Sequence, residues 1–61
     1  MRFNIGEAVL IKSEDAGEAY TVVAHHPETE DFFEYYTIRT IHSNHNDYYI
    51  DAVGEDLTRA P

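Results

Sequence analysis

The chain has 61 residues, 43% of them apolar, with five Tyr and three Phe, which suits one small folded domain spanning residues 1–61. Twelve acidic residues against four basic ones give a net charge of −8. This charge disfavours direct binding to nucleic acid or to an anionic membrane, since both require clustered Lys and Arg. Without cysteine, neither disulfides nor thiolate metal sites can stabilise the domain, so hydrophobic packing must do so.

The N-terminal half predicts two strands. The first is Glu7–Lys12, a short apolar block with β-branched residues that follows Gly6, a residue free to adopt a positive φ. A turn at 13–17 separates it from a second strand, Glu18–His25. Strict alternation there would place Tyr20, Val22 and Ala24 on one face and Thr21, Val23 and His25 on the other. Pro27 cannot donate to a ladder, so this strand is expected to end near His26.

The third expected strand, Phe32–Ile41, is rich in aromatic and β-branched residues. A helix starting at Pro27 is the alternative, because acidic residues follow that proline and Phe32, Phe33 and Tyr36 have helical spacing. If this segment is a strand, Phe32, Tyr36 and Ile38 would lie together on the core face. Glu34 would then point inward at a cost, unless a bulge intervenes or the strand begins only at Tyr35.

The C-terminal part predicts a polar loop at 42–47, a fourth strand at Tyr48–Val53, one 3₁₀ turn after Gly54, and a final short strand at Leu57–Ala60. Tyr36, Ile38 and Ile50 are the expected core residues, and Leu57 is expected to return to the core.

These segments resemble the small SH3-like barrels, most closely prokaryotic members of the KOW and Tudor-like kind. The similarity covers Phe3–Val9, Tyr20–Val22, Tyr35–Ile38, Tyr49–Ile50 and Glu55–Leu57. It implies a five-stranded, partly open antiparallel barrel with a short helical turn before the last strand. The chain departs from peptide-binding SH3 domains in lacking Trp and from KOW modules in being acidic, so neither proline-rich peptide binding nor RNA binding is carried over.

An outward-facing aromatic surface is the candidate binding site. Alternation places Tyr35 and Tyr49 outward, where they are expected to lie side by side on paired strands, with Phe33 extending the surface. Glu34 and Asp51 would add negative charge. Such a surface favours a basic protein or peptide, through cation–π contact and charge attraction. Stiffening of the sheet and a homodimer face are the alternatives.

Metal binding and catalysis have little support. His42 and His45 could hold a metal with a carboxylate such as Asp47, but these loop residues have no partner cysteines. Neither a nucleophile elbow nor a phosphate-binding glycine loop is present. We therefore expect no cofactor and no enzyme activity.

The sequence predicts a non-enzymatic, acidic protein-interaction module. An accessory domain of nucleic-acid-associated machinery and a self-associating structural domain remain alternatives. With no apolar run of 18 residues and no apolar signal segment, we expect a cytoplasmic location.

Overall fold

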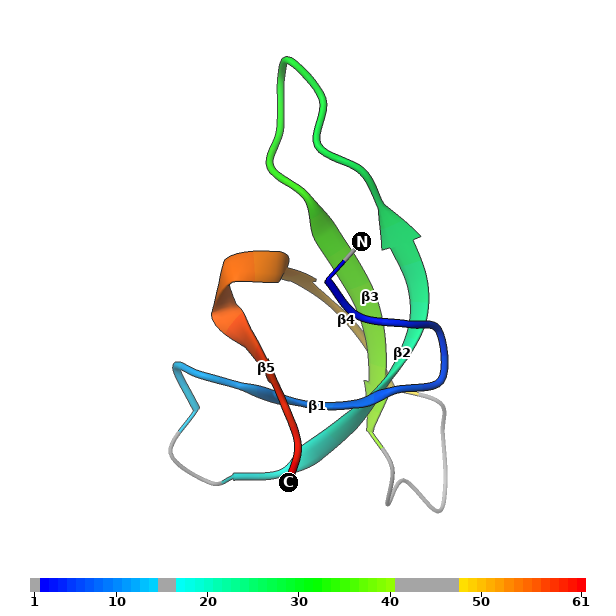
Figure 1. Ribbon diagram of the computed structural model, residues 1–61, viewed down its shortest axis with the longest axis vertical. Coiled ribbons are helices and arrows are strands. Elements are labelled where there is room, and N and C mark those ends of the chain that lie inside the picture. Colours follow the sequence, from blue (N-terminus) through cyan, green and yellow to red (C-terminus); the bar gives the residue numbers. More distant parts are fainter. Residues whose placement is uncertain (1, 15–16, 41–47) are drawn as a thin grey trace.

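The computed structural model describes residues 2–14, 17–40 and 48–61 and is all-β (Figure 1). Its elements are the strands β1 (Ala8–Ile11), β2 (Ala19–His26), β3 (Tyr35–Thr40), β4 (Tyr49–Val53) and β5 (Leu57–Arg59), with the 3₁₀ turn η1 (Gly54–Asp56) between the last two. The five expected strands and the 3₁₀ turn are thus confirmed, although the third strand begins at Tyr35 rather than Phe32, and its expected last residue, Ile41, lies outside the described residues. The helix alternative after Pro27 is wrong, since residues 27–34 are irregular. No helix in the described residues is long and apolar enough to cross a membrane.

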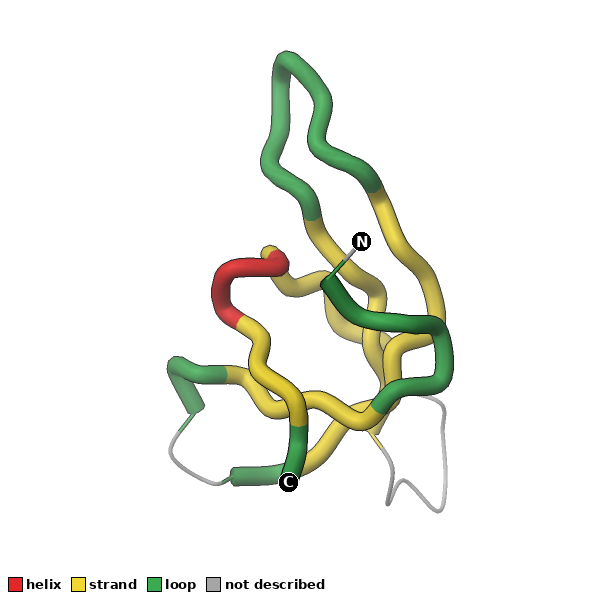
Figure 2. The backbone as a smooth tube through the Cα atoms, in the orientation of Figure 1, coloured by secondary structure: helices red, strands yellow, loops and turns green. Residues whose placement is uncertain are grey.

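All five strands form one antiparallel sheet in the order β4-β3-β2-β1-β5. The two edge strands, β4 and β5, do not pair, so the sheet is not closed. They are nevertheless joined by the three residues of η1 alone, which forces the sheet to curl until its edges approach (Figure 2). A hydrogen bond from Lys12 N to Asp56 O, at 2.7 Å, attaches η1 to the end of β1.

The concave face of the curled sheet holds the core. Its buried side chains are Phe3, Val9, Tyr20, Val22, Tyr36, Ile38 and Leu57. The expected core positions Tyr36, Ile38 and Leu57 are confirmed. Ile50 is only partly buried, because β4 is an edge strand and covers the margin of the cluster.

A β-bulge interrupts the pairing of β2 with β3. Val22 pairs with Ile38, but Ala24 pairs with Thr37, so the register shifts by one residue in between. The extra residue of the bulge moves every later residue of β2 to the opposite face of the sheet. His25 therefore lies on the inner face, opposite Tyr36. The expectation that Ala24 shares a face with Val22 is therefore wrong.

The strand alternation does not extend back to Phe32. The backbone N–H of Thr29 donates to Phe32 O at 3.0 Å, and the Thr29 hydroxyl accepts from Phe32 N at 3.2 Å, which closes a turn. The strand begins at Tyr35. This is one of the two arrangements that were expected to keep Glu34 from pointing into the core. Phe32 is consequently exposed, and its predicted place on the core face is wrong.

The N-terminal segment passes over β3 and β4 in the view of Figure 1. Tyr36 of β3 holds this segment in place. The Tyr36 hydroxyl accepts hydrogen bonds from Arg2 N at 2.8 Å and from Phe3 N at 3.3 Å. The segment then turns at Gly6, whose φ of 90° suits glycine, with Glu7 N donating to Asn4 O at 3.0 Å. One tyrosine hydroxyl of β3 thus fixes the start of the chain over the core.

Tyr20, at the other end of the core, donates its hydroxyl to both carboxylate oxygens of Glu14, at 2.8 and 3.0 Å. Burial raises the pKa of Tyr20 to about 12, and the hydrogen bond to Glu14 and the negative charges of Glu14 and Glu18 add to this effect. The phenol therefore stays a neutral donor, which satisfies its buried polar end.

Tyr36→Phe should lower the free energy of unfolding by about 1–3 kcal/mol, since the buried Phe3 N–H would lose its acceptor. Urea denaturation measures this change. Tyr48→Phe removes a hydroxyl from an exposed ring and should change the free energy of unfolding by less than about 0.5 kcal/mol. Equal stability of both variants would contradict the role assigned to the Tyr36 hydroxyl.

Candidate functional site

The long connection between β2 and β3 extends beyond the sheet (Figure 1). Aromatic side chains gather where this connection joins β3. Phe32 and Phe33 are 54% and 66% exposed, with their ring centroids 6.3 Å apart. Phe32 meets Tyr35 edge to face at 5.3 Å, and Tyr35 stacks on His26 at 4.2 Å. These four residues, Phe33, Phe32, Tyr35 and His26, form a continuous aromatic row. The row exists because the bulge in β2 places His26 on the outer face, opposite Tyr35.

Beside the aromatic row lies a depression of about 200 Å³, here called the outer hollow, lined by Phe32, Tyr35, Asp51 and Val53. Tyr35 and Val53 are direct partners in the β3–β4 pairing, which brings the elements of this wall together. The outer hollow therefore combines two aromatic rings, one aliphatic side chain and one carboxylate.

A hydrogen-bond chain orients the carboxylate of Asp51. Thr37 donates its hydroxyl proton to Asp51 Oδ1 at 2.8 Å, and the same hydroxyl oxygen lies 2.9 Å from His26 Nε2. Because the single hydroxyl proton is already directed to Asp51, Nε2 of His26 must be the donor to Thr37. The chain fixes Asp51 in place while leaving the residue exposed to solvent.

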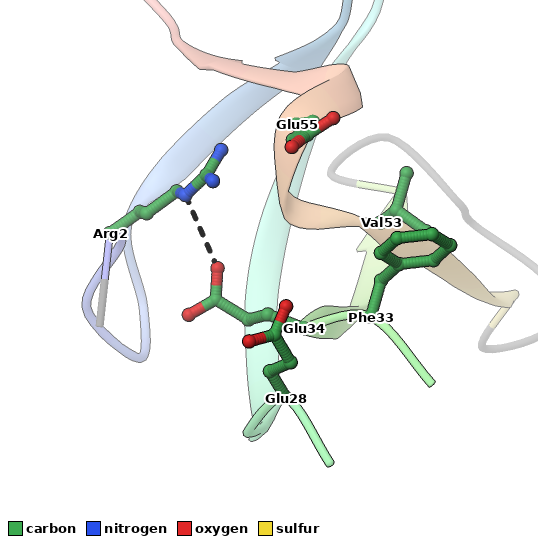
Figure 3. Close-up of a pocket in the computed structure, with 6 residues that line it drawn as sticks. All are labelled: Arg2, Glu28, Phe33, Glu34, Val53 and Glu55. Atoms are coloured by element: carbon green, nitrogen blue, oxygen red, sulfur yellow. Dashed lines mark ion pairs between the residues drawn. The ribbon is translucent and has the colours of Figure 1, made fainter. Parts of the chain in front are cut away.

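A second depression, here called the inner pocket, shares Val53 with the outer hollow and is drawn in Figure 3. It has a volume of about 190 Å³ and is lined by Arg2, Glu28, Phe33, Glu34, Val53 and Glu55. In Figure 3 the carboxylates of Glu28 and Glu34 lie on the side of Arg2, and the Phe33 ring lies against Val53 across from them.

Glu34 is the most constrained acid of this pocket. Its Oε2 accepts a hydrogen bond from His25 Nε2 at 3.0 Å, and its Oε1 forms an ion pair with Arg2 Nε at 3.3 Å. The hydrogen bond from His25 lowers the pKa of Glu34 below its usual value of 4.5, with the positive charges of His25 and Arg2 adding to the effect and partial burial opposing it. The His25 ring is in turn held against Tyr36, with centroids 4.9 Å apart.

The structure separates the residues predicted for the binding site. Tyr35 and Asp51 line the outer hollow, and Phe33 ends the aromatic row. Tyr35 and Tyr49 do not lie side by side, because Tyr35 pairs with Val53 and Tyr49 pairs with Arg39 at the opposite end of the ladder. That expectation is wrong, and Tyr49 lies outside this site.

Glu34 does not belong to the outer surface. Its side chain turns to the inner side, where it binds His25 and Arg2, since the strand begins one residue after it. The residues that sequence reasoning missed are Arg2, His26, Glu28, Phe32, Val53 and Glu55. Only Val53 carried a usable signal, because strand alternation places it on the same face as Tyr49 and Asp51.

The weak metal candidates His42 and His45 lie outside the described residues. Within 2–14, 17–40 and 48–61, no group of three or more metal-ligating side chains is arranged to hold an ion.

Comparison of the chain with protein-family models, with curated proteins and with solved structures finds no match. The function must therefore be inferred from the geometry of this surface.

Stability should fall in acid partly through Glu34. A carboxylate with a lowered folded pKa stabilises the fold above its unfolded pKa, near 4.5, and this contribution disappears as the pH falls through the folded value. Glu34→Gln should therefore lose less stability than wild type between pH 5 and the acid transition, as thermal melting at a series of pH values would show. Parallel pH profiles for the two proteins would contradict this account.

Proposed function

We propose that this protein is a non-enzymatic interaction module that binds a basic segment of another protein through the aromatic row and the outer hollow. The observation that carries the proposal is the placement of two exposed phenylalanines beside an oriented carboxylate in a chain of net charge −8. A Lys or Arg side chain in the outer hollow would contact the rings of Phe32 and Tyr35 and pair with Asp51.

The exposed aromatics are unusual for so small a protein. Phe32 and Phe33 would bury far more apolar surface in a core, yet a turn at Thr29 holds them outside it. Contiguous exposed apolar surface bordered by polar residues is typical of interaction sites, and aromatic residues are enriched at the centres of interfaces. The net negative charge favours a basic partner, because it attracts that partner over long range.

We further propose that the open five-stranded sheet is of the SH3-like kind, in the KOW and Tudor-like group. The strand order β4-β3-β2-β1-β5 and the 3₁₀ turn before the last strand support this assignment. A cytoplasmic location accords with the absence of cysteine.

The probe for this function is a six-residue peptide that alternates Arg with Ala, compared with the same peptide in which citrulline, a neutral isostere, replaces Arg. Titration of the ¹⁵N-labelled protein should shift the backbone amides of Tyr35, Asp51 and Val53 with the Arg peptide and not with the citrulline peptide. The shifts should weaken as salt rises.

The double variant Phe32→Ala/Asp51→Asn should bind the Arg peptide about five- to tenfold more weakly, the sum of one exposed cation–π contact and one ion pair. Asn at position 51 keeps an acceptor for Thr37. Ile5→Ala is the matched control, since Ile5 is 57% exposed but lies outside both depressions. Equal binding of the citrulline peptide, or unchanged binding by the double variant, would overturn the proposal.

A further inference from the structure

We propose that the inner pocket accepts a second basic side chain of the same partner, and that Arg2 occupies the entrance in its absence. This inference rests on the proposed function, because it extends the binding site from one depression to two. The partner would then be a segment with two Lys or Arg residues, one on each side of Val53.

The size and lining of the inner pocket suit one long basic side chain. Pockets for drug-sized molecules have volumes of about 300–1,000 Å³, whereas this one has about 190 Å³. Phe33 and Val53 offer an apolar wall to an aliphatic stem, and Glu28 and Glu34 face them with carboxylates (Figure 3). Lys and Arg match such a pocket because each combines an apolar stem with a cationic head.

The charge of the pocket is incompletely balanced. Three glutamates line it against the single guanidinium of Arg2. Arg2 pairs with Glu34, whereas Glu28 and Glu55 form no hydrogen bond or ion pair within the described part of the chain. Moreover, Glu34 Oε1 is buried and receives no hydrogen bond, since its 3.3 Å contact with Arg2 is an ion pair without hydrogen-bond geometry. A further cation would meet acceptors that the chain itself leaves unsatisfied.

Gly54 makes room for this arrangement. A Cβ atom at position 54 would come within 2.5 Å of Glu34 Oε1 and 3.3 Å of the Tyr36 ring. The backbone N–H of Gly54 also donates to Glu34 O at 3.0 Å, which fixes the residue that supplies the carboxylate. The glycine at the start of η1 therefore lets Glu34 keep its carboxylate beside the pocket.

Arg2 is placed to act as a replaceable occupant. Its backbone is held at both ends of the residue, by Arg2 N donating to the Tyr36 hydroxyl and by Arg59 Nη2 donating to Arg2 O at 2.7 Å. Its side chain, by contrast, is 51% exposed and makes one ion pair among the described residues. The guanidinium can thus leave Glu34 without releasing the N-terminal segment from the sheet.

The two depressions share a wall. Val53 lines both, and the neighbouring Phe32 and Phe33 face the outer hollow and the inner pocket respectively. A peptide that crosses Val53 could place one basic side chain in each. Two such contacts from one segment bind more tightly than either alone, because the second is intramolecular once the first has formed.

The test uses the same Arg–Ala peptide with a variant that removes two charges from the pocket. Glu28→Gln/Glu55→Gln should weaken binding about fivefold, the size of two partly exposed ion pairs. Glu14→Gln/Glu18→Gln removes the same charge at exposed positions away from the aromatic row and both depressions, keeps an acceptor for the Tyr20 hydroxyl, and should change affinity less than twofold. Thermal melting before titration verifies that both variants fold. Equal weakening in both variants would mean general attraction by net charge and would overturn the inference.

Arg2→Ala gives the opposite and more specific signature. If Arg2 competes with the partner, its removal should tighten peptide binding two- to threefold while the backbone bonds of residue 2 remain, whereas Lys12→Ala, which removes the same charge outside both depressions, should leave binding within twofold of wild type. Weaker binding by Arg2→Ala would show that the guanidinium is part of the binding surface and would overturn the inference.

Failure of the proposed function and failure of this inference have different outcomes. If the peptide shifts no amide in wild type, the proposed function fails. If it shifts Tyr35 and Asp51 but Glu28→Gln/Glu55→Gln binds as wild type does, the outer hollow stands and the inner pocket is excluded.

Discussion

The single-residue bulge between Val22 and Ala24 determines both faces of this small sheet. Before it, β2 contributes Tyr20 and Val22 to the core. After it, His25 points inward to Tyr36 and Glu34, and His26 points outward to Tyr35 and Thr37. Without the bulge, Ala24 would lie over Tyr36, and His25 would lie opposite Tyr35 on the outer face, away from the Glu34 carboxylate that it now binds. The inner ion-pair cluster and the outer aromatic row thus depend on the same backbone irregularity.

The sequence predicts the strands well because each is a short run of β-branched and aromatic residues between strong turn signals. The 3₁₀ turn at Gly54 and the core positions Tyr36, Ile38 and Leu57 follow from the same patterns. The bulge could not be predicted, since Thr21–His26 alternates plausibly in either register. Register also explains the error over Tyr49: alternation assigns a residue to a face, but only the pairing of two strands shows which residues are neighbours.

The candidate site was harder to predict than the fold because most of it lies outside the strands. Phe32, Phe33 and Glu28 belong to the irregular connection 27–34, where no periodicity applies and the Thr29 turn decides which way the rings point. Arg2 reaches Glu34 across 32 positions of sequence, a contact that depends on the Tyr36 hydroxyl holding the N-terminal segment. Long-range hydrogen bonds of this kind leave no local trace in the sequence.

The most direct test of this account is a nuclear Overhauser measurement between histidine and tyrosine ring protons in the free protein. The bulged register predicts contacts between the His25 and Tyr36 rings and between the His26 and Tyr35 rings, whose centroids lie 4.9 and 4.2 Å apart. A regular strand would instead place the Ala24 methyl group against Tyr36 and the His25 ring against Tyr35. Observation of that second pattern would contradict the inner cluster, the aromatic row and the functions inferred from them.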